Sequence, residues 1–168
     1  MSLYRVHEND PAMFPSIWGL WASSSSHSDY VNAHRLAQQL MRMGQQSNNP
    51  VYDQQGHFAL ADTLYWQGEF IKSREHLEYI KVIYSSTDHA KHISEFGEDA
   101  GVTSGAYLSW SLWFLGFSDQ AMQVSLQTVA LAHRLGHPFS QAYALSFAAI
   151  LRCRMRLPDE ALLLAEET

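Results

Sequence analysis

The amino-acid sequence predicts an all-α fold in which antiparallel helix hairpins stack into a right-handed superhelix. Three observations lead to this prediction. Apolar and small residues recur at helical spacing through most of the chain. Glycine and proline residues divide the chain into segments of helical length. No segment combines an alternating apolar pattern with a hairpin turn, the combination that is typical of β-strands.

Composition and charge exclude several classes of protein. The 168 residues are 46% hydrophobic and 17% charged, which is the balance of a globular domain that can bury a core. The net charge is −6 and the 11 Lys and Arg residues are scattered, so we expect no direct binding of nucleic acid. The single cysteine, Cys153, fits a reducing cytoplasm. No apolar run approaches the roughly 20 residues that cross a membrane, so we expect a cytoplasmic protein without a membrane partner.

Residues that start and stop helices place the first four helices. Proline is favoured in a first helical turn, and Pro15 and Pro50 each precede an apolar segment. Gly44 and Gly68 follow such segments, as glycine often does at a helix end. The expected elements are a disordered lead-in or vector-derived start over residues 1–13, a helix from Phe14 into the serine run 23–26, and helices over 28–44, 50–67 and 70–84.

The hairpin at residues 104–136 is the clearest element of the chain. Residues 104–115 are apolar nearly all round, as expected for a helix that is covered on more than one side. Gly116 is suited to end this helix. Ser118 and Asp119 are suited to begin the next one, as a capping residue and a favourable negative charge in the first turn.

The remaining segments complete the expected array. Residues 85–102 carry mixed charge and two glycines, and we expect a connector with one short helical turn. Two further helices are expected at 138–155 and from Pro158 onward, each with proline in its first turn. The sequence thus predicts about eight helices in four hairpins. These would form one repeat domain over residues 14–168, as a fragment of a larger protein.

The turns inside the four hairpins are alike. They read SDYVNA, GEFIKS, GFSDQA and RLPDEA, and the small residues that end them, at 33, 73, 121 and 161, lie 40, 48 and 40 residues apart. These spacings lie within or just past the range of helical-hairpin repeats. Twelve positions before each small residue stands the residue expected to touch it from the first helix of the pair. These four residues are Trp21, Ala61, Ser109 and Ala149, and three of them are small, as close helix crossing requires.

Two stretches carry a resemblance to a known family. The stretches LWFLGFSDQAMQVSLQTVALAHRLGHPFSQAYALSFAAILRCRM and DTLYWQGEFIKSREHLEYIKVIY resemble the tetratricopeptide-like (TPR-like) region of large bacterial signalling proteins. The resemblance covers about residues 16–168, with Ser118 where such turns often have proline and Trp21 where a small residue is usual. In those proteins a predicted ATPase module, often with an adenylate or guanylate cyclase, a kinase or a LuxR-type DNA-binding domain, is followed by helical repeats.

The resemblance implies a non-catalytic domain for protein–protein interaction or signal relay within a larger bacterial regulator. ATPase or cyclase activity would then belong to the parent chain outside this segment. The implied partner is a protein or peptide, a neighbouring domain of the parent chain, or a second copy of this chain. Two alternatives stay open: an independent helical metal-dependent enzyme, and a structural spacer that forms homodimers.

Aromatic residues on the first helices of the hairpins are the candidate binding residues. Stacked hairpins place these helices side by side, so that their faces form one groove on the concave side. Aromatic anchors beside a few polar groups suit the capture of a peptide or a partner helix. The alternative is that the rings form the core between repeats. The candidates are Trp18, Asp62, Tyr65, Trp66, Trp110 and Trp113.

We expect no catalytic, cofactor or metal site in this segment. The sequence has neither a phosphate-binding glycine loop nor a dinucleotide motif. A closed zinc site normally has four protein ligands, and the histidine pairs lack a third and a fourth. The residues weighed for metal binding or acid–base catalysis are the pairs His89/His92 and His133/His137, and the acidic residues Glu95, Glu98 and Asp99 of the connector.

Overall fold

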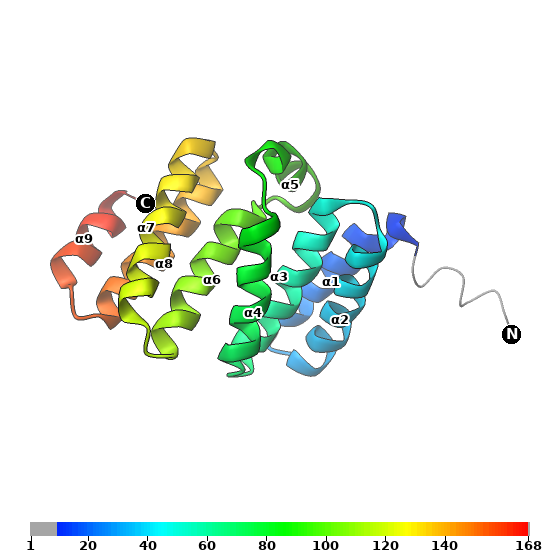
Figure 1. Ribbon diagram of the computed structural model, residues 1–168, viewed down its shortest axis with the longest axis horizontal. Coiled ribbons are helices and arrows are strands. Elements are labelled where there is room, and N and C mark those ends of the chain that lie inside the picture. Colours follow the sequence, from blue (N-terminus) through cyan, green and yellow to red (C-terminus); the bar gives the residue numbers. More distant parts are fainter. Residues whose placement is uncertain (1–9, 168) are drawn as a thin grey trace, which may run out of the picture.

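The computed structural model describes residues 10–167, and every regular element in that part of the chain is a helix (Figure 1). The predicted all-α class is confirmed. Residues 1–9 of the expected lead-in and residue 168 lie outside the described part. The elements are η1 Pro11–Met13, α1 Phe14–Ser26, α2 Tyr30–Gln46, α3 Pro50–Trp66, α4 Phe70–Ile83, η2 Ser86–Asp88, α5 His89–Phe96, α6 Ala100–Phe114, α7 Ser118–Leu135, α8 Pro138–Arg154 and α9 Pro158–Glu167, where η marks a short 3₁₀ helix.

The segment 85–102 differs from the prediction. It holds η2 and the two-turn helix α5, where a connector with one short turn was expected. Helix α6 begins at Ala100, because the side chain of Asp99 accepts hydrogen bonds from the backbone N–H groups of Gly101 and Val102. The described residues therefore form nine α-helices, one more than the eight expected.

Helices that follow one another in the chain pack side by side (Figure 1). This holds from α1 to α4 and again from α6 to α9, and α4 packs directly on α6, so that α5 stands outside the row. The first helices of successive hairpins also touch, α1 with α3, α3 with α6 and α6 with α8. Helices α3 and α6 are consequently buried on most sides, as the apolar character of residues 104–115 predicted.

The four hairpin turns share one backbone feature. The first residue of each aligned turn takes a positive φ, which bends the chain sharply out of the preceding helix. Glycine does this at Gly68 and Gly116, with φ of 81° and 87°, whereas Ser28 and Arg156 take the same conformation at 59° and 61°. The alignment of the turns made from the sequence is thus matched by their geometry.

One of the four pairs of facing residues is joined by a hydrogen bond. The hydroxyl of Ser73 donates to the backbone oxygen of Ala61 at 2.8 Å, across the α3–α4 hairpin. A larger residue at either position would push the two helices apart. This contact between residues twelve positions apart agrees with the spacing argument.

Two glycines bring α2 and α3 into backbone contact. A methyl group at Gly44 would lie 2.5 Å from the carbonyl oxygen of Tyr52, and one at Gly56 would lie 2.7 Å from that of Leu40. Distances this short leave no room for any side chain. The two helices belong to different hairpins, so this contact, here called the glycine crossing, joins the first hairpin to the second.

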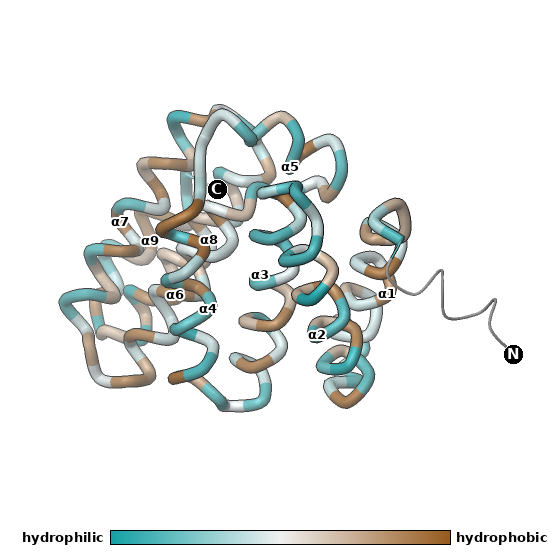
Figure 2. Tube along the Cα trace, turned by 45° about the vertical axis from the view of Figure 1, so that its right-hand side comes forward, coloured by the Kyte–Doolittle hydropathy of each residue, from teal (hydrophilic) through white to brown (hydrophobic). Residues whose placement is uncertain are grey.

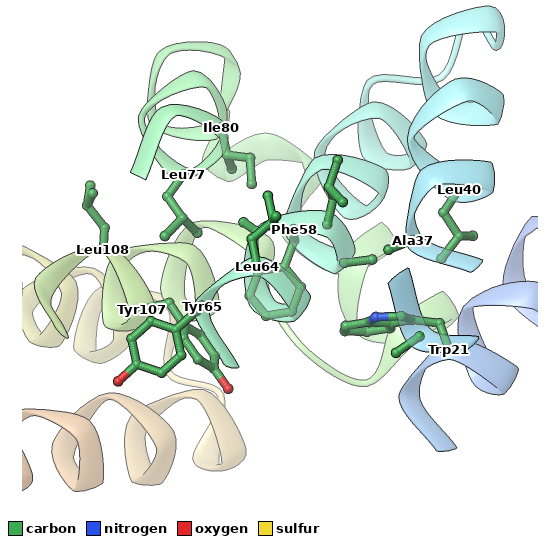
Figure 3. Packing of buried hydrophobic residues seen from close by; sticks show 14 of the residues in the cluster. Trp21, Ala37, Leu40, Phe58, Leu64, Tyr65, Leu77, Ile80, Tyr107 and Leu108 are labelled. Atoms are coloured by element: carbon green, nitrogen blue, oxygen red, sulfur yellow. The ribbon is translucent and has the colours of Figure 1, made fainter. Parts of the chain in front are cut away.

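A continuous hydrophobic core runs through the molecule from Phe14 in α1 to Leu151 in α8. Figure 3 shows its middle part, where Trp21, Phe58 and Tyr107 come from three different helices. Along the chain, hydrophobic and hydrophilic residues interchange within the helices, as expected for helices that bury one face (Figure 2). In the described part of the chain, no helix is both long and apolar enough to cross a membrane.

Candidate binding site between the first helices

A cavity of about 160 Å³ lies between the first helices of the hairpins. Helices α1, α3, α6 and α8 all contribute to it, together with the loop that joins α5 to α6, and we call it the four-helix cavity. Aromatic rings, hydroxyl groups and two carboxyl groups form its walls. Its lining residues are Trp18, Trp21, Ala22, Ser25, Ser26, Phe58, Asp62, Glu98, Tyr107 and Tyr143.

Helical periodicity explains how these residues meet. On α1, positions 18, 21, 22 and 25 fall on one face, and on α3 Phe58 and Asp62 are one turn apart. The segment that contains α5 is anchored to α3, since His92 Nε2 donates to Gln54 Oε1 at 2.9 Å and Gln55 Nε2 donates to His92 Nδ1 at 3.3 Å. This anchor places the following loop, with Glu98, at the cavity.

Hydrogen-bond donors of the protein surround the carboxyl group of Asp62, which is 5% exposed. Its Oδ2 accepts from the hydroxyl of Ser25 at 3.1 Å, and its Oδ1 accepts from the indole N–H of Trp66 at 3.1 Å. The phenol of Tyr107 also hydrogen bonds to it. Burial raises the pKa of Asp62, while these three donors act in the opposite direction. Asp62 is therefore held in a fixed position by its neighbours.

Glu98 is the second acid of the cavity, and its Oε1 atom lacks the hydrogen-bond donors that surround Asp62. Its Oε1 atom is enclosed by protein and has no hydrogen-bond partner among the described residues. Burial, together with the negative charges of Asp62 and Asp99, raises the pKa of Glu98 to about 8. Glu98 consequently keeps its proton at neutral pH when nothing else occupies the cavity.

Two tyrosines, Tyr107 from α6 and Tyr143 from α8, line the cavity together with the two acids. Burial, and then the negative charge of Asp62, raises the pKa of Tyr107. Burial and the charge of Glu98 do the same for the pKa of Tyr143, which hydrogen bonds to Tyr107. Both phenols therefore stay protonated and serve as hydrogen-bonding groups. Among the described residues that line the cavity, none is Lys, Arg or His.

The six residues proposed from the sequence fall into two groups. Trp18 and Asp62 line the four-helix cavity, and Trp66, 48% exposed, lies beside it through its bond to Asp62. Tyr65 and Trp110 do not face a groove: they are 5% and 6% exposed and belong to the core. The remaining candidate, Trp113, is half-buried and packs against that core.

Sequence reasoning missed eight of the ten residues that line the cavity, among them Trp21, Tyr107, Tyr143 and Glu98. Trp21 had been singled out only as a bulky residue at a position that is usually small, and this departure is the signal that could have pointed to the cavity. Tyr107 and Tyr143 lie on first helices, as the proposed residues do. Glu98 was weighed only as one of three acidic residues in a connector.

The histidine pairs have partners that do not converge. His89 donates to Asp99 at 2.8 Å, whereas His92 bonds to the glutamines of α3. His133 lies 3.3 Å from Glu167, and His137 accepts from the backbone N–H of Ser140 and so caps α8. Within residues 10–167 no group of three or more His, Cys, Asp or Glu residues could hold a metal ion.

Comparisons of the chain with protein-family models, with curated proteins and with solved structures found no match. Function therefore has to be inferred from the cavity itself. Its aromatic walls supply apolar surface, its tyrosines and serines supply hydrogen bonds, Asp62 supplies negative charge, and Glu98 supplies a carboxyl group that is neutral at pH 7. This combination suits recognition of a small polar group that projects from a larger molecule.

Proposed function

We propose that this chain is a TPR-like helical-repeat domain that binds a protein or peptide partner along α1, α3, α6 and α8. In this proposal the hairpins form a right-handed superhelix, and the domain relays a signal within a larger bacterial regulator. The observation that carries the proposal is the four-helix cavity, because each of the four first helices contributes to it. The shared geometry of the four turns and the contacts between successive first helices support the repeat architecture.

The chemistry of the cavity favours binding over catalysis. Asp62 is committed to donors of the protein, and three of the residues weighed for metal binding or acid–base catalysis have structural roles. Asp99 caps α6, His92 anchors α5 and His137 caps α8. A fixed set of hydrogen-bonding groups around a small cavity is typical of recognition sites. The enzyme alternative therefore has less support than the binding domain.

A cavity-filling variant tests this proposal. A display library of peptides of about ten residues would be selected against the immobilised protein, and affinities would be measured by fluorescence anisotropy. Ala22→Phe places a ring in the cavity, so we expect it to weaken binding of the selected peptides at least tenfold. Val31→Phe is the matched control, since Val31 is exposed on α2, away from the cavity. We expect this control to bind like the wild type.

Other outcomes count against the proposal. Equal binding by both variants would place the peptide elsewhere on the molecule. A library that yields no binder, with sedimentation showing a stable dimer, would favour the homodimer alternative. Either result removes the four-helix cavity as the partner-binding site.

A further inference from the structure

The four-helix cavity is lined by two acids, of which only Asp62 has hydrogen-bond donors from the protein, and Glu98 stays neutral at pH 7 by keeping its proton. A buried carboxylate needs hydrogen-bond donors or a positive charge, because it has lost its water. Asp62 has three donors, whereas Glu98 Oε1 has none, and no basic side chain lines the cavity among the described residues. The partner that would complete the site is therefore a donor with positive charge, supplied from outside.

The walls of the cavity are suited to the same kind of group. Aromatic faces attract ammonium and guanidinium ions, and the rings of Trp18, Trp21, Phe58, Tyr107 and Tyr143 all line the cavity. The protein already uses this interaction within its own chain. The guanidinium of Arg154 lies 4.1 Å from the ring centre of Trp110 and 5.1 Å from that of Phe114.

We propose that the four-helix cavity binds an alkylammonium or guanidinium group, and that in the partner this group is the side chain of a lysine or an arginine. The identity of the carrier rests on the function proposed above, whereas the preference for an organic cation does not. The cation would lie against the rings, attracted by the negative charge of Asp62 and by the carboxylate that Glu98 forms when it gives up its proton. It would supply the positive charge that none of the described lining residues carries.

The size of the cavity limits what can enter it. Pockets that enclose a drug-sized ligand usually measure about 300–1,000 Å³. A volume of about 160 Å³ accommodates the head of one side chain. This limit favours a single residue of a peptide as the occupant.

Because Glu98 holds a proton in the free protein, the affinity for a cation should depend on pH. Binding of a cation favours the carboxylate, so at neutral pH it releases the proton that the free protein holds on Glu98. Affinity should then rise with pH up to about 8. The titratable groups that face Glu98 are Asp62 from α3, Asp99 from its own loop, Tyr107 from α6 and Tyr143 from α8. The two tyrosines stay neutral in this range, so Glu98 dominates the dependence.

Short peptides test the proposal without knowledge of the natural partner. Four acetylated and amidated pentapeptides, Gly-Gly-X-Gly-Gly, would carry arginine, lysine, citrulline or norleucine at X, and butylguanidinium would serve as the free cation. Binding would be followed by the NMR signals of the tryptophan indole N–H groups. We expect the arginine and lysine peptides to bind at least tenfold more tightly than the citrulline and norleucine peptides.

A pair of variants tests whether the carboxyl group of Glu98 is the one that attracts the cation. Glu98→Gln keeps the shape of the side chain, and we expect it to weaken the arginine peptide at least tenfold and to abolish the rise of affinity with pH. Glu95→Gln removes the same charge from the exposed surface of α5. We expect this control to leave the affinity for the arginine peptide and its rise with pH unchanged. The melting temperature of each variant would verify that the fold is kept.

Each other outcome has a distinct meaning. Equal binding of the arginine and norleucine peptides would overturn the cation proposal and leave the peptide-binding function standing. Binding of butylguanidinium without binding of any peptide would support the cation site and overturn the peptide-binding function. An absence of binding by all five ligands would overturn the cation proposal.

Discussion

Gly56 is one of the two residues that let α3 pack closely against α2. A methyl group at this position would lie 2.7 Å from the oxygen and 2.9 Å from the carbon of the Leu40 carbonyl. Backbone cannot move aside as a flexible side chain can. We expect Gly56→Ala to lower the free energy of unfolding by about 1–3 kcal/mol, although alanine is the better helix former. Urea denaturation measures this change.

Gly19 provides the matched control. It lies within α1, and a methyl group there would meet no atom within 4 Å. Gly19→Ala should therefore raise the free energy of unfolding by about 0.5–1 kcal/mol, through helix propensity alone. If Gly56→Ala were stabilising by a similar amount, the close approach at the glycine crossing would be refuted.

The role of a glycine within a helix is hard to predict from sequence. Gly44 was expected to end its helix, but α2 continues to Gln46 and Gly44 lies at the glycine crossing. The same residue type serves as a helix stop at Gly116, where φ is 87°. Local sequence does not distinguish the two roles, because the neighbour that requires a glycine at 44 lies on another helix.

At the scale of the helices, Trp110 and Trp66 allow core and surface rings to be compared. Trp110 is buried, stacks on Phe147 with ring centres 4.0 Å apart and donates to the backbone oxygen of Phe147 at 3.0 Å. We expect Trp110→Ala to lower the free energy of unfolding by about 3–5 kcal/mol. Trp66→Ala should cost about 1–2 kcal/mol, because it removes mainly hydrogen bonds at a half-exposed position. Similar losses in the two variants would contradict these assignments.

Most helices could be predicted from the sequence because their signals are local. Proline in a first turn marked α3 and α8, and the aligned turns marked the hairpins. Helix α5 was missed because its anchor is not local: His92 bonds to Gln54, which lies 38 positions earlier in the chain.

The candidate site was predicted only in part, for the same reason. Trp18 and Asp62, which line the cavity, could be named from the sequence because they lie on first helices with a repeating pattern. Glu98 reaches the cavity only through the position of α5, which no local pattern reveals. The burial of Tyr65 and Trp110 depends on the depth at which hairpins pack, and the sequence left open whether these rings are exposed.

At the scale of the whole molecule, two groups with strongly shifted pKa values contribute to how stability depends on pH. Burial and the neighbouring His76 lower the pKa of His57 from 6.5 to about 4. The stability that the neutral imidazole of His57 contributes is therefore lost as pH falls from about 6.5 towards 4. Glu98 has its pKa raised from 4.5 to about 8, so stability is lost as pH rises through that interval. We expect a stability maximum between about pH 5 and 7, since the two effects oppose each other.

Variants separate the two groups. In wild type, the free energy of unfolding should fall by at most about 1.4 kcal/mol per pH unit at pH values above the stability maximum. In Glu98→Gln this fall should disappear. In His57→Gln the loss below the maximum should be reduced. Urea denaturation between pH 4.5 and 9 measures both profiles. Parallel profiles of Glu98→Gln and the wild type from pH 5 to 8 would show that Glu98 is not buried as an acid.

The glycine crossing also determines how the molecule opens. In an array of repeats, stability is divided between each repeat and its interfaces with the next, and opening spreads until it meets an interface too strong to separate. The crossing lies between α2 and α3, and so between two hairpins rather than within one. The first two hairpins should therefore open as one cooperative unit. Local unfolding that begins at α9 would stop before it reaches these two hairpins. Helices α1 and α3 would then keep their half of the cavity while the backbone amides near α9 exchange their hydrogens with solvent.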